Sequence, residues 1–314
     1  MNKANIPSGT WPVMLTPFKT DGTVDYEAFE KLIEFYLNAG VVGLFACCGS
    51  GEILELTVDE MVNISANVIK LVDGRVPVVS GAILHDQMPA QIEFAKRVAD
   101  TGPEAVVLSP NQFVREGQSD EELLAKLKEI TGALDDIPLG IYEYPMPYKI
   151  LISDHILKWL ISTERYVFFK DTCCDIDIIK RRLSIIRTSN MAHFNAHLPT
   201  FLESLRYGCN GYCGTAANFC PELYRWLSEN FEKKPRVAEL VAQTALKFNK
   251  ITDLCDNYPA NAKTYLNMIG VSMENYCRRD VPEITDEHKK ILRGFASELD
   301  DFLTSTLYKE ECIA

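Results

Sequence analysis

The chain has 314 residues, of which 47% are hydrophobic and 24% charged, a composition typical of a soluble globular protein. Its net charge of -12 argues against non-specific nucleic-acid binding and against long-range attraction of an anionic substrate. No apolar run reaches the ~18 to 20 residues that span a bilayer, and no charged, apolar leader with a cleavage site opens the chain. We therefore expect a cytoplasmic protein without nucleic-acid or membrane partners, whose ten cysteines are free thiols.

Short apolar runs alternate with helical patterns along most of the chain. This alternation is typical of repeated strand-helix units with a parallel sheet. Eight such strands, each followed by a helix, predict an α/β fold of the (β/α)8 TIM-barrel type. No Gly-x-Gly-x-x-Gly follows the first strand, which argues against a dinucleotide-binding sheet. The predicted strands cover residues 13–15, 41–47, 76–80, 105–108, 137–142, 166–169, 192–196 and 211–214.

The predicted helices carry start signals, and the last of them follow one another without a strand. Thr57 with Glu60, and Ser119 with Glu122, fit the capping box, and Asp25 fits the N-cap of the first helix. After the helix of the eighth unit, helical patterns cover residues 234–255, 262–269 and 285–307. The sequence thus predicts a barrel over residues 1–231 and a helical extension over residues 232–314, packed on the barrel's flank or on another subunit.

A lysine stands at the end of one apolar strand. Lys170 follows the run 166–169 and comes directly before a polar turn. Burying its ammonium group costs several kcal/mol unless the charge is paired or the pKa falls. A neutral amine can attack a ketone to form a Schiff base, so this position suits a nucleophile. The alternative is a structural lysine whose charge pairs with Asp171.

Two other strand ends offer groups that could work with this lysine, because all strands of a barrel end at one mouth. The amides of the turn Gly49-Ser50-Gly51, with the Ser50 hydroxyl, can bind an anion. The turn lacks the lysine and the length of a nucleotide P-loop, which favours a carboxylate; an ordinary turn is the alternative. Tyr142 ends the strand before that of Lys170, so its phenol could transfer protons beside a Schiff base, or cap the core.

Several motifs together give the chain a resemblance to a known family. With them the sequence resembles, over nearly its whole length, the pyruvate-dependent class I aldolases that include dihydrodipicolinate synthase and N-acetylneuraminate lyase. The motifs are Thr16-Pro17-Phe18, Cys48-Gly49-Ser50-Gly51-Glu52, Tyr142-x-x-Pro145, Lys170-Asp171-Thr172, Gly208-x-x-Gly211 and Ala217-Asn218.

This resemblance implies a reaction and its partners. By it, Lys170 forms an imine with pyruvate or a related 2-keto acid, Tyr142 relays protons, and Gly49, Ser50 and Gly51 hold the carboxylate. The enamine derived from the imine forms or cleaves a carbon-carbon bond with an aldehyde. The resemblance also implies a homotetramer built as a dimer of dimers. No metal and no organic cofactor is expected.

Differences from the family pattern limit the choice of substrate. Gly49 lacks the hydroxyl, and Phe113 the phenol, that dihydrodipicolinate synthases carry at these places, and no arginine lies within residues 144–151. These differences argue against the lysine-biosynthetic reaction itself. Gly49 instead resembles the turn of keto-deoxy sugar-acid dehydratases in the family, which makes such a dehydratase an alternative. A second alternative is a catalytically inactive homologue that only binds a 2-keto acid.

Three further residues at predicted strand ends are candidates for substrate binding. His197 follows the seventh strand, where sugar-cleaving members of the family place a polar residue against substrate hydroxyls. Glu143 stands where the family often has Asn, and would either bind the far end of the substrate or turn outward. Tyr212, on the predicted eighth strand, completes the set.

Cysteines gather around the predicted mouth, as the adjacent pairs 47–48 and 173–174 and at residues 209, 213 and 220. Adjacent cysteines place their side chains on opposite faces of an extended chain, so neither pair forms a CxxC-type zinc site. A composite metal site across the barrel is an alternative. We expect instead small buried apolar residues, with one or two oxidation-sensitive thiols near the site.

Overall fold

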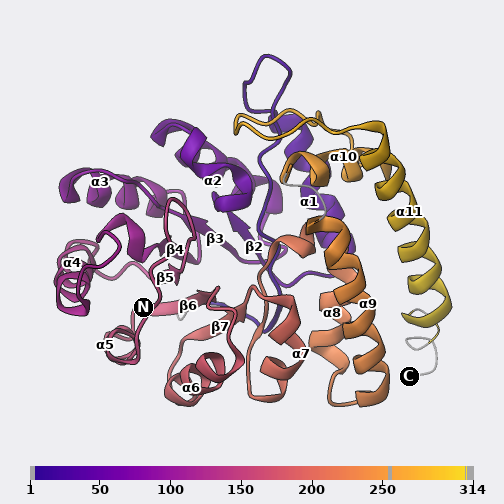
Figure 1. The fold of residues 1–314 in the computed structure, drawn as a ribbon. Coiled ribbons are helices and arrows are strands. Elements are labelled where there is room, and N and C mark those ends of the chain that lie inside the picture. The colour runs from indigo at the N-terminus through magenta and orange to yellow at the C-terminus, as the bar shows by residue number, and fades with distance from the viewer. Residues whose placement is uncertain (1–3, 254–256, 308, 310–314) are drawn as a thin grey trace.

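Within residues 4–253, 257–307 and 309, which the computed structural model describes, eight parallel strands form a barrel surrounded by helices (Figure 1). Hydrogen bonds join the strands in the order β1-β8-β7-β6-β5-β4-β3-β2, and a bridge from Val13 to Phe45 closes the ring between β1 and β2. The predicted (β/α)8 TIM barrel is thereby confirmed. The strands are β1 (Gly9–Thr10), β2 (Leu44–Ala46), β3 (Val78–Gly81), β4 (Ala105–Leu108), β5 (Leu139–Tyr142), β6 (Tyr166–Asp171), β7 (Ala192–Asn195) and β8 (Gly211–Tyr212).

The first strand differs from its predicted position. The apolar pattern predicts a strand over residues 13–15, but the regular ladder to β8 lies earlier, at β1. Alternate residues of this segment face different neighbours: Trp11 N donates to Tyr212 O at 2.9 Å on the β8 side, whereas Thr10 O accepts from Val42 N at 3.1 Å on the other side. Further along the chain, Met14 N donates to Phe45 O of β2, and Phe45 N donates to Pro12 O, each at 3.0 Å. The first strand is therefore shared between two neighbours, and this sharing closes the barrel.

The helices start where the sequence predicted. The Thr57 hydroxyl accepts from the Glu60 amide while the Glu60 carboxylate accepts from the Thr57 amide, and Ser119 and Glu122 repeat the arrangement. Asp25 caps the first helix with its side chain. Each cap is worth about 1 kcal/mol. The helices that follow the strands are α1 (Tyr26–Asn38), α2 (Val58–Val72), α3 (Met88–Ala99), α4 (Asp120–Ala133), α5 (Asp154–Ser162), α6 (Ile176–Ile186), α7 (Leu198–Arg206) and α8 (Pro221–Asn230). Short 3₁₀ turns cover Gly49–Gly51, Ile53–Glu55, Pro110–Gln112 and Thr215–Asn218.

Aromatic side chains fill the barrel interior below the mouth. Trp11, Phe45, Phe168 and Phe194 are fully buried, and their neighbouring rings have centroids 4.8 to 5.8 Å apart. Burying each such side chain contributes about 1.5–3 kcal/mol. Because side chains alternate along a strand, Phe168 and Lys170 share the inward face of β6. The aromatic cluster is therefore the floor of the cavity that Lys170 faces.

The C-terminal extension is helical and packs on the outside of the barrel. In its described part it contains α9 (Pro235–Asp253), α10 (Ala260–Met268), α11 (Asp286–Phe302) and a π-helical turn over Leu303–Leu307, with no strand between them. Helix α9 packs on α7 and α8, and α11 packs on α9 and α10 (Figure 1). The last residues of the helix predicted over 234–255 lie outside the described residues. The domain boundary after residue 231 stays a prediction.

A buried ion pair ties this extension to the turn after β2. Lys263 Nζ of α10 lies 2.8 Å from Glu52 Oε1, and both side chains are fully buried. Lys263 also donates to Tyr276 O at 2.7 Å. The other carboxylate oxygen of Glu52 accepts from the amides of Arg278 and Arg279 at 2.8 and 2.9 Å. The segment between α10 and α11, gold in Figure 1, is thereby held over the end of the barrel.

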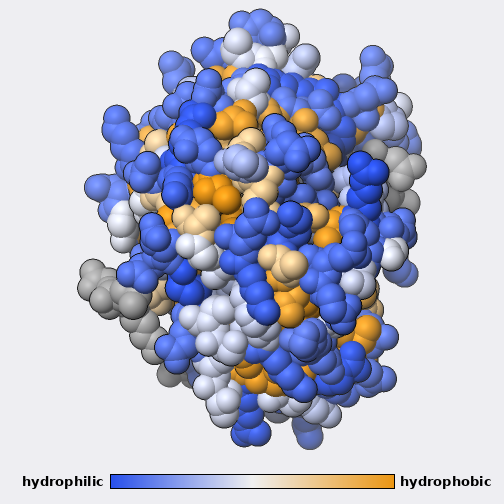
Figure 2. All heavy atoms as spheres, turned by 90° about the vertical axis from the view of Figure 1, so that its left-hand side faces the viewer, coloured by the Kyte–Doolittle hydropathy of each residue, from blue (hydrophilic) through white to orange (hydrophobic). Residues whose placement is uncertain are grey.

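One face of the molecule has the surface of an ordinary folded domain. The face formed by α3, α4 and α5 is mostly hydrophilic, with small apolar patches scattered among polar residues (Figure 2). Scattered apolar patches of this kind are normal on a folded protein. Among the described helices, none is long and apolar enough to cross a membrane.

Candidate active site

Lys170 projects into the barrel mouth from β6. Only 4% of the residue is exposed, and its Nζ atom lies 3.9 Å from the ring centroid of Tyr142 and 5.4 Å from that of Phe45. Burial lowers the pKa of the Lys170 amine from its ordinary value. A lower pKa increases the fraction of neutral amine, which is the nucleophilic form.

Asp171, the next residue on the strand, faces the opposite side. Its carboxylate lies 2.7 Å from Nη1 of Arg182 and 2.9 Å from Nε2 of His193. The alternative in which Lys170 is a structural lysine paired with Asp171 is therefore wrong. Among the described carboxylates, none forms an ion pair with Lys170. The amine thus faces the mouth without a fixed counter-charge.

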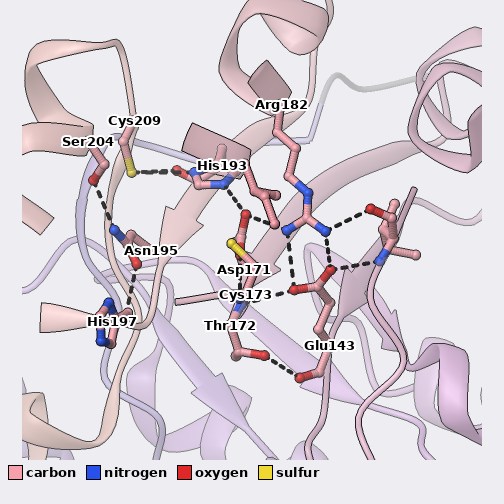
Figure 3. Close-up of polar contacts among 12 residues, drawn as sticks. Glu143, Asp171, Thr172, Cys173, Arg182, His193, Asn195, His197, Ser204 and Cys209 are labelled. Atoms are coloured by element: carbon pink, nitrogen blue, oxygen red, sulfur yellow. Dashed lines mark hydrogen bonds and ion pairs between the residues drawn. The ribbon is translucent and has the colours of Figure 1, made fainter. Parts of the chain in front are cut away.

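Figure 3 shows a buried charge network behind the mouth, between the strands and α6. Arg182 of α6 donates to Asp171 at 2.7 Å and to Glu143 at 2.6 Å, and all three side chains are at most 1% exposed. Glu143 also accepts from the amides of Ile152 and Thr172, at 2.8 and 3.1 Å. These bonds join the ends of β5 and β6 to α6, and so fix the strand ends that carry the mouth residues.

Glu143 is therefore not where the sequence suggested. It neither reaches the substrate side nor turns outward to solvent, because it follows the inward-facing Tyr142 and points to the helix layer. Burial raises the pKa of Glu143 to about 7, the Asp171 carboxylate adds to the increase, and Arg182 opposes it. Both carboxylate oxygens are engaged by Arg182 and by backbone amides. This geometry gives Glu143 a structural role.

His193 makes the stability of this network depend on pH. Burial opposes its protonation, but Cys209 and Asp171 outweigh burial and raise the pKa of His193 to about 10. An unfolded histidine titrates near ~6.5, so the stabilisation is complete below that pH and is lost as the pH rises through the folded-state pKa. We expect the free energy of unfolding, measured by urea titration, to fall between pH about 6.5 and about 10. In His193→Gln the free energy of unfolding should fall less over this pH range. An equal fall in wild type and in the variant would contradict the role of His193 in this pH dependence.

Tyr142 lies beside Lys170, and the two residues are paired in register across β5 and β6. The residue is 5% exposed. Burial raises the pKa of Tyr142 well above its ordinary value, with Cys48 and Cys213 adding to the increase. The hydroxyl therefore keeps its proton at neutral pH and can donate it. The structure thus brings together the two residues predicted to be catalytic.

The predicted anion-binding turn is a buried 3₁₀ turn directly after β2. The amides of Gly49 and Ser50 begin this turn, and such positions have no acceptor within a helical turn. Gly51 differs, because its amide donates to Cys48 O at 2.9 Å. A Cβ atom on Gly51 would lie 2.9 Å from Thr16 Oγ1. Gly51 therefore allows the segment after the first strand to come close, while the amides of Gly49 and Ser50 are the candidate donors.

A hydrogen-bond chain that the sequence analysis missed orients the Ser50 hydroxyl. Tyr258 Oη donates to Ser50 Oγ at 2.7 Å, and Asn218 Nδ2 donates to Tyr258 Oη at 2.7 Å. Asn218 Oδ1 accepts from the Tyr36 hydroxyl at 2.6 Å. Apart from Ser50 itself, only Asn218 belongs to a motif noted in the sequence. Because Ser50 accepts from Tyr258, its own proton is free to be donated to a bound anion.

Two further unpredicted residues, Tyr144 and Arg279, flank Gly49. A Cβ atom on Gly49 would lie 2.5 Å from Cε2 of Tyr144 and 3.4 Å from the Tyr142 hydroxyl oxygen. Arg279 Nη2 donates to Gly49 O at 3.2 Å. Tyr144 is 2% exposed, and its hydroxyl has no hydrogen-bond partner within the described part of the chain. Leaving a hydroxyl buried in this way costs about 1–3 kcal/mol.

The remaining two predicted site residues, His197 and Tyr212, lie in different parts of the structure. His197 lies at the start of α7, half-buried, with Nδ1 3.2 Å from Thr200 Oγ1. Burial lowers the pKa of His197, and the nearby Lys149 adds to the decrease, so the ring is neutral at neutral pH. Tyr212 instead points into the helix layer and stacks on Tyr224 of α8, with ring centroids 4.3 Å apart. We correct its assignment, because it lies outside the mouth.

The cysteines do not form one cluster. Cys48 and Cys213 are buried near Lys170, and burial raises the pKa of Cys213 to about 12 and also raises that of Cys48. Both therefore remain protonated thiols. Cys209 lies in the network behind the barrel wall and Cys174 is exposed. In the part of the chain that the structure describes, no group of three or more His, Cys, Asp or Glu side chains could hold a metal ion.

The fold is a (β/α)8 barrel with a buried lysine and a buried tyrosine at its mouth. The model of the dihydrodipicolinate synthetase family matches residues 6–299, so the chain belongs to this family of pyruvate-dependent class I aldolases and lyases.

Relatives within the family carry different reaction names. The chain is 28% identical over 228 residues to a probable 5-dehydro-4-deoxyglucarate dehydratase of Streptomyces avermitilis, covering 70% of each protein. It is 25% identical over 303 residues to the 4-hydroxy-tetrahydrodipicolinate synthase of Ehrlichia canis, covering 96% of this chain and 99% of that one. The crystal structure of dihydrodipicolinate synthase from Acinetobacter baumannii complexed with pyruvate matches with a TM-score of 0.84 and 22% identity, over 94% of this chain and 99% of that chain. The structural similarity agrees with the observed barrel fold, and the family follows from the match of its model.

Proposed function

We propose that the protein is a Schiff-base-forming class I aldolase or lyase that acts on pyruvate or a related 2-keto acid. One observation carries the proposal: the Lys170 amine is buried at the mouth, 3.9 Å from the ring centroid of Tyr142, and its neighbour Asp171 is engaged elsewhere. The carboxylate of the keto acid binds the amides of Gly49 and Ser50 and the Ser50 hydroxyl. The aldehyde partner enters from the mouth.

In the proposed reaction, the neutral Lys170 amine attacks the ketone carbon, and a proton passes from nitrogen to oxygen to give a carbinolamine. Tyr142 then donates its proton to the hydroxyl, which leaves as water, and a protonated imine remains. The Tyr142 phenolate takes a proton from C3 of the imine and so gives the enamine. The enamine adds to the aldehyde carbonyl to form a carbon-carbon bond, and the reverse sequence cleaves one.

A keto-deoxy sugar-acid dehydratase is the second candidate. It shares the imine, but the enamine expels a hydroxyl group from the carbon next to C3. Gly49 and the relative named as a probable 5-dehydro-4-deoxyglucarate dehydratase favour it. Supplying 5-dehydro-4-deoxyglucarate as substrate distinguishes the two candidate functions, because aldol cleavage of this keto acid releases pyruvate and its dehydration does not.

Borohydride trapping tests the proposal. The protein is incubated with pyruvate and sodium borohydride, digested, and mapped by mass spectrometry. The expected result is a reduced adduct on Lys170. Without an adduct from pyruvate or from larger 2-keto acids, the imine proposal fails, and the reading as an inactive, keto-acid-binding homologue replaces it.

Replacing the Tyr142 hydroxyl is expected to slow the reaction without preventing attack by the amine. Tyr142→Phe should lower the rate of hydrogen-deuterium exchange at C3 of pyruvate, followed by NMR, by about 10²- to 10⁴-fold, because general acid-base catalysis is lost. Some borohydride-trapped adduct should remain. The control is Tyr166→Phe, which removes a hydroxyl bonded to Thr131 at the other end of β6. Equal exchange rates in wild type and Tyr142→Phe would exclude Tyr142 from the relay.

We also propose a homotetramer, organised as a dimer of dimers. The family resemblance supports it. Light scattering of the purified protein should give four times the mass of one chain, and a monomer mass would contradict the proposal.

A further inference from the structure

One polar group of the mouth has no part in the proposed reaction: the hydroxyl of Tyr144. The residue is 2% exposed, and its hydroxyl is buried without a hydrogen-bond partner among the residues described. Its ring centroid lies 5.5 Å from that of Tyr142. Buried hydroxyls are normally paired, so one that is unpaired beside a reactive amine calls for an explanation.

The backbone around Tyr144 is held rigidly. Its amide donates to Ser109 Oγ at 3.3 Å. Asn111 Nδ2 donates to the carbonyl oxygens of Tyr144, Met146 and Tyr148, at 2.8, 2.7 and 2.9 Å. The two N–H groups of Asn111, shared among three carbonyls, and the Tyr144 amide therefore fix the position of this loop, while the hydroxyl at its inner end stays unsatisfied.

The ring of Tyr144 occupies the space that a side chain at position 49 would need. A Cβ atom on Gly49 would lie 2.5 Å from Cε2 and 3.2 Å from Cδ2 of Tyr144. Gly49 and Tyr144 are thus matched, since any larger residue at position 49 would displace the ring. The ring lies against the same residue whose amide is proposed to hold the keto-acid carboxylate.

A positive charge lies near this phenol. Arg279 donates to Gly49 O at 3.2 Å and acts electrostatically on Tyr144. Burial nevertheless raises the pKa of Tyr144 to about 12, so the hydroxyl carries its proton and can act as a donor. A donor beside a cation is complementary to an anion.

We propose that the Tyr144 hydroxyl donates a hydrogen bond to the carboxylate of the 2-keto acid bound at Lys170. This inference rests on the proposed function and adds a substrate-binding residue to it. Tyr144 places its phenol ring beside Gly49, which has no side chain of its own. Arg279 makes this end of the site electropositive.

The test measures how pyruvate binding depends on this hydroxyl. Borohydride trapping on Lys170 is followed by mass spectrometry over a range of pyruvate concentrations, in wild type and in Tyr144→Phe. The variant keeps the ring and its packing on Gly49. The concentration for half-maximal trapping should rise about tenfold or more, the effect of losing one hydrogen bond to a charged group. Trapping should still reach completion at saturating pyruvate.

Two controls separate binding from structure. Tyr148→Phe removes a hydroxyl of the same loop that donates to Val114 O at 3.1 Å, and should leave half-maximal trapping unchanged. The midpoint of thermal unfolding should stay the same or rise in Tyr144→Phe, since an unpaired buried hydroxyl is lost, and should fall slightly in Tyr148→Phe. If the Tyr144 hydroxyl had a purely structural role, Tyr144→Phe would lower the unfolding midpoint and leave half-maximal trapping unchanged.

A second variant keeps the test decisive if Tyr144→Phe fails to fold. Gly49→Ala pushes the Tyr144 ring aside and should also raise the half-maximal pyruvate concentration. Unchanged pyruvate dependence in Tyr144→Phe would overturn the inference. Absence of trapping in wild type would instead refute the imine, and Tyr144 would then be judged by whether pyruvate raises the unfolding temperature of wild type more than that of Tyr144→Phe.

Discussion

Replacing Lys170 with alanine is expected to abolish turnover, with a loss of at least about 10⁴-fold, because the proposed imine cannot form without this amine. Borohydride trapping with pyruvate should give no adduct. The protein should still fold, since removing a buried amine also removes its desolvation cost. Thermal unfolding and circular dichroism check the fold, and initial rates with the identified substrate check the loss.

The matched control is Lys149→Ala. Lys149 is an exposed lysine near the mouth that donates to Thr172 O at 2.7 Å. This variant should keep pyruvate trapping on Lys170. Turnover that survives in Lys170→Ala would rule out the imine mechanism, and an adduct that moves to Lys149 would reassign the nucleophile.

Replacing Arg182 with methionine should destabilise the protein by about 3–5 kcal/mol. Arg182 is the shared partner of Asp171 and Glu143, and all three side chains are at most 1% exposed. Without the guanidinium, two buried carboxylates would face each other without their shared counter-charge. Urea denaturation monitored by fluorescence measures the loss as a lower midpoint.

The neighbouring arginine provides the comparison. Arg181 pairs with Asp154 at 2.8 Å, but its side chain is 54% exposed. Surface pairs of this kind contribute about 0–1 kcal/mol, so Arg181→Met should change the midpoint little. If Arg182→Met and Arg181→Met have the same urea midpoint, the buried network does not stabilise the protein as much as its burial implies. If Glu143→Gln partly rescues Arg182→Met, repulsion between the carboxylates is the cause.

The barrel and its two central residues were predictable because their signals are local. Apolar runs mark the strands, and caps such as Thr57 with Glu60 mark the helix starts. Lys170 ends one apolar run and Tyr142 the run before it, so the strand-helix-strand geometry alone predicts that they are neighbours. The register of β5 and β6 confirms this prediction.

The alternation of side chains along a strand turns two of the predicted site residues away from the mouth. Tyr142 faces inward, so the adjacent Glu143 had to face the helix layer, where Arg182 binds it. Tyr212 faces the helix layer in the same way, and the next residue, Cys213, is the one near Lys170. Period-two counting from Tyr142 gives the orientation of Glu143, whereas that of Tyr212 depends on the register of β8 against β7.

Other residues of the site had no local signal. Tyr258 contacts Ser50 across 208 residues of sequence, and Arg279 contacts Gly49 across 230 residues. These contacts exist because the extension folds back over the mouth, and a single sequence does not encode that path as a repeating pattern. The role of Tyr144 was equally hidden, since it depends on the space left by Gly49.

During synthesis, Lys170 and the residues of the C-terminal extension that lie over the mouth are made at different times. Arg279 is made 109 residues after Lys170, which at ~5–20 residues per second is a delay of roughly 5 to 20 s. In that interval the turn after β2 lacks Tyr258 against Ser50 and lacks Lys263 against Glu52. A ribosome-bound chain therefore carries the proposed nucleophile before the proposed carboxylate pocket is finished, and the site is assembled only after the C-terminal extension has been made.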